Sequence, residues 1–383
     1  MSNTNTRRPY LLEIDVMRII LILGVLLTHT QSTMSNATDV NSVSRAVFSY
    51  THLMLHFTRM GFVFITGLVL MWRYYQRPFN WFLFWKRRYV RIGIPYIFWI
   101  SIYLIGIMLI KQQSLSSFWP QWLDTIMHGS QFYMYYLFMI AQLYLVFPIF
   151  RWLFEQFEQQ HQLILLLSLV LQLLLVATIK YGHPTNGEHP LLGVIFWHYG
   201  TDPLMYQLYF VLGAYSAVHY QSVTRLIDQF GRQLSAIAVG LSVMSIGLYW
   251  FDLQILHLNH HQAESIHQPF MVIMDVAMIL MVWYVGRCYV DWQADKKHNL
   301  GLHYSGQLVF GIYLMQTIML TILAGMLRLI NWPSWVYLFL TPITFCSVFG
   351  GTYLLVAMVS RSTILRPLVG LKLTNDEGKL KSY

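Results

Sequence analysis

The sequence predicts an all-α protein, a polytopic membrane bundle of about ten transmembrane helices with both termini in the cytoplasm. Composition is the first reason. The chain has 383 residues, of which 56% are hydrophobic and 11% charged, and its mean hydropathy is +0.48. Soluble domains carry about 25% charged residues, so a water-soluble fold is excluded. Long apolar stretches and an uneven distribution of Lys and Arg supply the other two reasons.

A helix needs about 20 mostly apolar residues to cross a bilayer. The predicted spans, taken in order, cover residues 14–33, 50–72, 92–110, 131–150, 161–179, 203–221, 233–253, 268–287, 305–329 and 335–358. No segment between them is long enough to fold as a soluble domain. We therefore predict one membrane domain over residues 1–383, with a basic cytoplasmic tail at 359–383 that lies on the membrane surface.

The basic residues predict the orientation. With a cytoplasmic N-terminus, about 20 of the 25 Lys and Arg residues fall on the inner side. This bias explains the net charge of +9 without any nucleic-acid partner. The outer segments are polar and rich in histidine, and one of them contains His257, His260, His261 and His267. We interpret these histidines as part of a solvated loop, and a zinc site is the second interpretation.

Two further classes of feature are not expected. The first apolar run is too long and too interrupted by charge for a cleavable signal peptide. Cys288 and Cys346 fall within or near predicted spans, so a disulfide framework is not expected.

The first predicted span carries Asp15, Arg18 and His29. Arg18 and His29 are eleven residues apart, so on a helix they differ by about 20° in direction and about 16 Å in height. They share a face, with the arginine near the inner surface and the imidazole past the midplane. Asp15 is spaced to pair with Arg18. Charges in a bilayer usually mark function, although Arg18 snorkelling to the interface and a structural His29 remain alternatives.

The second span carries His52, His56 and Arg59 on one helical face. The two histidines would supply half of a metal site, but no acidic residue or cysteine at suitable spacing completes it, so no metal is predicted. Thr66 and Gly67 follow, and this pair allows close helix packing.

Arg87, Arg88 and Arg91 precede the third span. Arginine suits phosphate through its planar fork of donors. Three interpretations stay open for this basic stretch: a topology determinant, a site for anionic lipid, or a site for a phosphorylated cofactor. In the ninth span, Tyr313 and Gln316 lie one turn apart, and bundle packing would also account for them.

Together these motifs resemble the integral-membrane acyltransferase family 3, bacterial proteins related to exopolysaccharide and O-antigen O-acetylases. The family's acid, arginine and histidine of the first span match Asp15, Arg18 and His29. Its phenylalanine-rich stretch before Ser-Gly resembles FVFITGL, and its Arg-x-x-Arg before a proline resembles KRRYVRIGIP. The fourth, sixth and ninth spans resemble FYMYYLFMIAQLYLVFP, YFVLGAY and FGIYLMQ. The order agrees over essentially the whole chain.

The sequence departs from the family pattern at three positions. Thr66 replaces the serine, and Ala141 stands before Gln142 where some members have a glutamate. Gln316 stands where many have a histidine. His29 is then the main titratable candidate. The secreted hydrolase-like domain that some members append is not found in this sequence.

The resemblance implies transfer of an acyl group, usually acetyl, from cytoplasmic acyl-CoA to a hydroxyl of a surface glycan, at the bacterial plasma membrane. It implies no tightly bound cofactor, and it admits membrane lipid and other polysaccharide-assembly proteins as partners. Arg88 and Arg91, with Arg87 and Arg18, would hold the CoA phosphates. His29 would act as general base or acyl carrier, with general base preferred. The residues expected to line the cleft and orient the acceptor are Arg59, Thr66, Gly67, Tyr313 and Gln316.

Two other classes remain open at this point. One is a transporter or flippase for a polysaccharide or its precursor, in which the same polar residues line the path. The other is a non-catalytic membrane component of a polysaccharide-assembly complex. The spacing of Arg18 and His29 together with Arg88 and Arg91 favours the enzyme.

Overall fold

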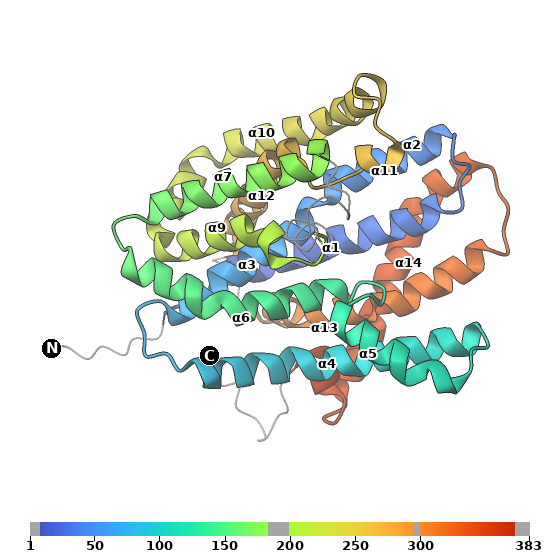
Figure 1. Ribbon diagram of the computed structural model, residues 1–383, viewed down its shortest axis with the longest axis horizontal. Coiled ribbons are helices and arrows are strands. Elements are labelled where there is room, and N and C mark those ends of the chain that lie inside the picture. Colours follow the sequence, from blue (N-terminus) through green and yellow to red (C-terminus); the bar gives the residue numbers. More distant parts are fainter. Residues whose placement is uncertain (1–7, 183–198, 294–298, 372–383) are drawn as a thin grey trace.

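A computed structural model of the chain describes residues 8–182, 199–293 and 299–371. The helices are α1 (Leu12–Ser35), α2 (Val43–Leu55), α3 (Phe57–Tyr74), α4 (Trp81–Ile110), α5 (Phe118–His128), α6 (Tyr135–Gln156), α7 (His161–Gly182), α9 (Gln207–Val218), α10 (Tyr220–Gln254), α11 (His260–Ala263), α12 (Pro269–Gln293), α13 (Asn299–Leu327) and α14 (Ser334–Arg361). Short 3-10 turns are η1 (Leu115–Ser117), η2 (Pro203–Tyr206) and η3 (Arg366–Val369). The described residues contain no strand, which confirms the predicted all-helical bundle (Figure 1).

Eight helices in the described part of the chain are long and apolar enough to cross a membrane, with the continuous stretch Val43–Tyr74 counted as one. All ten predicted spans coincide with helical segments. The two outside the eight are α1, which carries Glu13, Asp15 and Arg18 near its start, and α9. With only 12 residues, α9 is shorter than the bilayer requires. It is buried almost throughout, so its surroundings are other helices rather than lipid.

The helices divide into a buried inner group and a lipid-facing outer group. In the Val43–Tyr74 stretch 67% of the apolar window is buried, and in α12 and α13 the share is 56%. In α7 and α10 it is 17%, so most of their apolar side chains face outward. An apolar outer surface of this extent is typical of contact with hydrocarbon. In Figure 1, α1, α3 and α9 lie in the middle of the bundle, with α4 and α10 at opposite edges.

Helices α3 and α9 pack at backbone contact. A Cβ on Gly67 would lie 2.2 Å from the Phe210 carbonyl oxygen, and one on Gly213 would lie 2.1 Å from the Phe64 oxygen. Only glycine fits at both positions, which is the small-residue packing used between membrane helices. The close approach predicted at Gly67 is therefore present.

We call the end of the bundle where α3 ends and α4 begins the basic end. The Trp72 indole, near the end of α3, donates to the Pro9 carbonyl just before α1 at 3.2 Å. Tyr304 on α13 bonds Ser360, the penultimate residue of α14, at 3.2 Å. The start of α1 and the end of α14 therefore both lie here, as an even number of crossings requires.

Several predicted boundaries are wrong. Helix α4 begins at Trp81, not at residue 92, so the basic stretch that holds Arg87, Arg88 and Arg91 is part of this helix. Pro148 lies inside α6, which continues to Gln156. An unpredicted helix, α5, lies between two predicted spans. Hydropathy marks the apolar centre of a helix and says little about where its polar ends stop.

The segment directly after α14 packs back onto the bundle. Residues 366–369 form η3, which packs against α4, α13 and α14 with Val369 fully buried. The Trp99 indole on α4 donates to the Leu368 carbonyl at 2.8 Å. A docking partner this distant in sequence leaves no local signal. Residues 372–383 lie outside the described residues, as do residues 183–198, Arg7, Lys296 and Lys297.

Candidate functional site

The site is built along α1. This helix is continuous from Leu12 to Ser35, so Arg18 and His29 lie on one face about 16 Å apart along the axis. Arg18 is near the basic end and His29 is nearer the opposite end. The spatial relation predicted for these two residues is therefore present.

Arg18 belongs to a cluster of four arginines at the basic end. Arg91 on α4 lies within electrostatic range of Arg88, Arg18 and Arg73, which come from α4, α1 and α3. Among the described residues, no carboxylate pairs with Arg88 or Arg91. Arg88 lies over the rings of Phe84 and Tyr144, at 5.7 and 5.4 Å. Several guanidinium groups without counter-ions form a site for a multiply charged anion.

Arg91 has one further contact. Its Nη2 donates to the carbonyl oxygen of Gly370 at 3.4 Å, so the docked segment after α14 reaches the arginine cluster. Gly370 has a φ of +75°, and a Cβ there would lie 2.2 Å from the Phe310 ring. The turn that presents this carbonyl therefore requires glycine.

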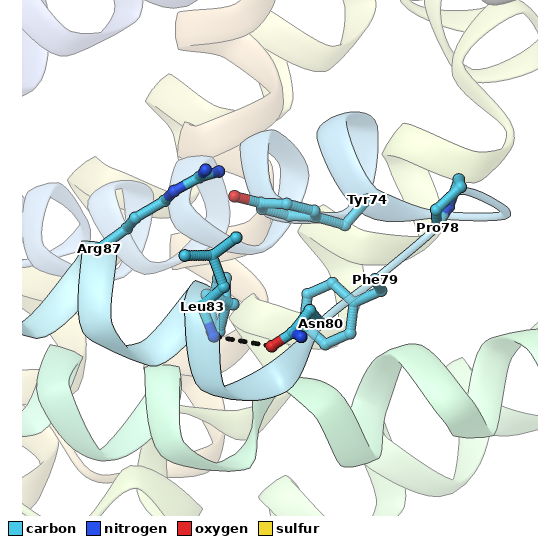
Figure 2. Close-up of a pocket in the computed structure, with 7 residues that line it drawn as sticks. Tyr74, Pro78, Phe79, Asn80, Leu83 and Arg87 are labelled. Carbon is cyan, nitrogen blue, oxygen red and sulfur yellow. Dashed lines mark hydrogen bonds between the residues drawn. The ribbon is translucent and has the colours of Figure 1, made fainter.

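Arg87 belongs to a pocket next to the cluster. It lines a pocket of about 310 Å³ between the end of α3 and the first turns of α4. Figure 2 shows its guanidinium and the Tyr74 hydroxyl extending toward one another above Leu83. The remaining lining residues are Pro78, Phe79, Asn80 and Phe84. The predicted trio Arg87, Arg88 and Arg91 is thus divided between two neighbouring environments.

Asp15 organises the basic end of α1. It is fully buried, and its Oδ1 accepts from Arg18 Nη1 at 3.0 Å. Its Oδ2 accepts from the Tyr10 hydroxyl at 2.6 Å and lies 3.1 Å from His303 Nδ1. Gly306 provides the space, since a Cβ there would lie 2.8 Å from the Asp15 side chain. The predicted Asp15–Arg18 pair is present, and His303 joins it from α13.

His303 has a defined arrangement of its own. Its Nε2 lies 2.8 Å from Gln307 Nε2, which can only donate. In the neutral ring Nε2 is then the acceptor, and Nδ1 carries the proton that it donates to Asp15. A carboxylate fixes the tautomer and orientation of this histidine in the same way that carboxylates orient catalytic and metal-binding histidines.

His29 lies against Tyr133, the second residue before α6. The two rings stack with centroids 3.7 Å apart and an interplanar angle of 27°. His29 is half-buried, and neither of its ring nitrogens forms a hydrogen bond with the described residues. An imidazole held by stacking with unengaged nitrogens is available to a bound substrate.

Arg59 is the centre of a second polar group, beside His29. Its Nη1 donates to the Tyr206 hydroxyl at 3.0 Å, and its guanidinium lies 4.8 Å from the centroid of the Tyr135 ring. His29, His52, His56 and His267 all interact electrostatically with it. Burial, with the Arg59 charge, lowers the pKa of His267, in the segment before α12, to about 3. His267 is therefore neutral at physiological pH.

His52 and His56 stack with centroids 5.2 Å apart. His52 Nδ1 lies 3.4 Å from the Ser32 hydroxyl, and His56 Nδ1 is buried without a partner. Across the described ranges, no group of three or more His, Cys, Asp or Glu residues lies close enough to hold a metal ion. The side chain of His261 lies outside the described residues.

Of the other residues predicted to orient the acceptor, only Tyr313 contacts the surroundings of His29. The Tyr313 hydroxyl donates to the Tyr133 carbonyl, so it belongs to the surroundings of His29. Gln316 is fully buried, and neither its Oε1 nor its Nε2 finds a hydrogen-bond partner. Thr66 Oγ1 donates to the Phe62 carbonyl of its own helix at 2.8 Å. Gly67 lies in the α3–α9 contact, away from His29.

Sequence reasoning missed three polar residues. Asp275 is buried, and its Oδ2 accepts from the Tyr209 hydroxyl at 2.9 Å. An acid in the predicted span 268–287 was a visible signal for it. His303 and Tyr133 offered no such signal, because their importance depends on contacts with α1.

A bundle of membrane helices with a cationic cluster at one end and an unengaged histidine further along the same helix face defines a polytopic membrane protein with an internal polar site. The sequence model of a family described as an acyltransferase domain matches residues 11–358 of the chain. The chain belongs to this family and is a multi-pass membrane acyltransferase, which confirms the family predicted from the motifs. Neither the curated proteins nor the solved structures contain a match to it.

Proposed function

We propose that the protein is located in the bacterial plasma membrane and moves a short acyl group, acetyl in the first instance, from acyl-CoA to a sugar hydroxyl. The sugar belongs to a cell-surface or exported polysaccharide. The arginine cluster carries the proposal. Four guanidinium groups lie together at the basic end, and among the described residues only Arg18, on the α1 face that also carries His29, is paired with a carboxylate. A donor with several phosphates at one end and a thioester at the other matches this layout.

Arg18, Arg88 and Arg91 hold the donor phosphates through charge-assisted hydrogen bonds. Asp15 keeps Arg18 extended toward them, since it binds Arg18 Nη1 at 3.0 Å and is itself fixed by two other donors. The acyl-carrying arm then runs along α1 toward His29.

His29 is the general base. Its neutral imidazole takes the proton of the sugar hydroxyl as that oxygen attacks the thioester carbonyl carbon. The carbon–sulfur bond breaks, and the imidazolium returns the proton to the departing CoA thiolate. Arg59 lies close enough to act electrostatically on His29 and supplies the positive charge that stabilises the developing oxyanion.

General base is preferred to acyl carrier for a structural reason. An acyl-imidazole is favoured where a carboxylate supports the second ring nitrogen. The described residues place no carboxylate in hydrogen-bond contact with His29, whose ring contact is Tyr133.

The test uses purified protein in detergent with radiolabelled acetyl-CoA and a surface-polysaccharide fraction. We expect label to enter the glycan with the wild type and to be lost with His29→Gln, by about 100-fold or more as is usual for a general base. His257→Gln is the matched control, because His257 is an exposed histidine at the opposite end. Wild-type transfer by His29→Gln would contradict the mechanism.

Failure of the wild type to bind or turn over any short acyl-CoA would contradict the proposal itself. The arginines and His29 would then line a path for another anionic substrate, and flux of a polysaccharide precursor would be the next measurement.

A further inference from the structure

The pocket beside Arg87 is not explained by the transfer step. It lies at the basic end, between the last residues of α3 and the first turns of α4, and has a volume of about 310 Å³ (Figure 2). This is the lower limit for pockets that bind small molecules. It suits one heterocycle with its sugar, and is too small for a complete acyl donor.

Three aromatic rings form its wall. Tyr74 lies 5.3 Å from both Phe79 and Phe84, and Phe79 and Phe84 are also 5.3 Å apart. Planar nucleobases bind to such rings by stacking and edge contacts.

The wall is held in place from outside the pocket. Arg151 on α6 donates to the carbonyls of Tyr74 and Arg77, both at 3.0 Å, and pairs with Glu155 at 2.7 Å. Its guanidinium also lies 4.7 Å from the Phe79 centroid, on that ring. The loop between α3 and α4 is therefore fixed to α6, and the pocket is formed before any ligand arrives.

The pocket adjoins the arginine cluster. Arg73 lies over the Tyr74 ring at 5.6 Å, and Arg88 lies over Phe84 at 5.7 Å. Two wall residues thus contact members of the arginine cluster. Arg87 itself is exposed and has no hydrogen bond or ion pair with the residues that the structure describes. One free cation at the pocket and several beside it match a nucleotide that carries phosphates at two separate positions.

We propose that this pocket binds the adenine ring of the acyl-CoA donor and that Arg87 contacts its ribose 3′-phosphate, while the neighbouring cluster holds the diphosphate. This rests on the proposed function, which supplies the donor. It assigns Arg87 a role distinct from that of Arg88 and Arg91, namely recognition of the one phosphate that distinguishes CoA from dephospho-CoA.

Calorimetric titration of the full-length protein with CoA and with dephospho-CoA tests the proposal. We expect Arg87→Gln to lower the affinity for CoA about tenfold, the effect of losing one charge-assisted bond, and to leave dephospho-CoA binding unchanged. Lys86→Gln is the control, because it removes the same charge from an exposed neighbour that does not line the pocket.

An equal loss of affinity for both ligands, or the same effect from Lys86→Gln, would overturn the pocket assignment. The proposal that acyl-CoA is the donor would still stand. Failure of the wild type to bind either ligand would instead count against the donor itself. Repeating the titration in nanodiscs with phosphatidylglycerol separates a nucleotide from a lipid headgroup. Discrimination that survives there supports the nucleotide, and its loss would assign Arg87 to lipid phosphate and overturn the proposal.

A second variant tests the ring site without altering charge. Leu83 is an exposed pocket residue, so Leu83→Trp fills the space without disturbing the buried core. We expect the preference for acetyl-CoA over acetyl-pantetheine, measured as a ratio of kcat/KM values, to fall at least tenfold. An unchanged ratio in a folded Leu83→Trp protein would show that the adenine ring binds elsewhere.

Discussion

Asp15 joins three side chains from different parts of the fold: Tyr10 before α1, Arg18 on α1 and His303 on α13. Its two oxygens bind Arg18, Tyr10 and His303, and it is wholly removed from solvent. A buried carboxylate is tolerated only with such partners. Each partner therefore affects how the others are held, and Arg18 is the one that belongs to the arginine cluster.

The role of His303 is testable through Arg18. His303→Gln removes the Nδ1–H that fixes Asp15, so Arg18 is less well positioned for the donor phosphates. We expect KM for acetyl-CoA to rise about five- to tenfold with kcat nearly unchanged, because the loss is one hydrogen bond to a charged group away from His29. Steady-state kinetics at saturating acceptor measures the split, with His257→Gln beside it. A fall in kcat at constant KM would contradict a positioning role.

At the scale of elements, the contact between α3 and α9 decides where the polar group around Arg59 lies. Arg59 is in the first turn of α3, and its partner Tyr206 immediately precedes α9. Gly67 and Gly213 let the two helices approach to backbone contact. The position of Arg59 beside His29 thus depends on two glycines in a contact between helices.

Gly67→Ala tests this contact. The new Cβ would meet the Phe210 carbonyl oxygen at 2.2 Å, and a backbone atom cannot move aside as a flexible side chain can. We expect a loss of about 1–3 kcal/mol in stability, the usual cost of overpacking, with lower activity. Thermal unfolding in detergent measures it. Gly240→Ala on α10 is the control, since a Cβ there meets nothing within 4 Å and should be neutral or slightly stabilising. Equal melting temperatures for both variants would refute the packing argument.

At the scale of the whole molecule, the arrangement of charge predicts its orientation in the membrane. The arginine cluster, the start of α1 and the end of α14 all lie at the basic end. The positive-inside rule places that end in the cytoplasm, where acyl-CoA is available.

Cysteine labelling tests the orientation in intact cells. Starting from a chain with Cys288 and Cys346 replaced by serine, we expect Lys86→Cys to resist a membrane-impermeant maleimide until the cells are opened. His257→Cys, at the opposite end, should react at once. Both positions are exposed, so burial does not limit either reaction. The reverse pattern would place the donor site on the wrong side for acyl-CoA.

The parts of the site that could be predicted from the sequence depend on distances along one helix. Arg18 and His29 share a face because both lie on one continuous helix, and Asp15 is close enough along it to pair with Arg18. The ten apolar segments were found because the bilayer imposes a minimum length. Helix ends, α5 and the docked η3 were missed or misplaced, because polar ends and short helices lack that constraint.

The sequence by itself determined the class of protein, the family and the Arg18–His29 axis, because these depend on composition and on local periodicity. Only the tertiary structure decided which side chains meet between helices. It brought His303 to Asp15, placed Tyr133 on His29 and separated Arg87 from Arg88. Contacts between residues as much as 288 positions apart depend on how whole helices pack, and no local pattern encodes that packing.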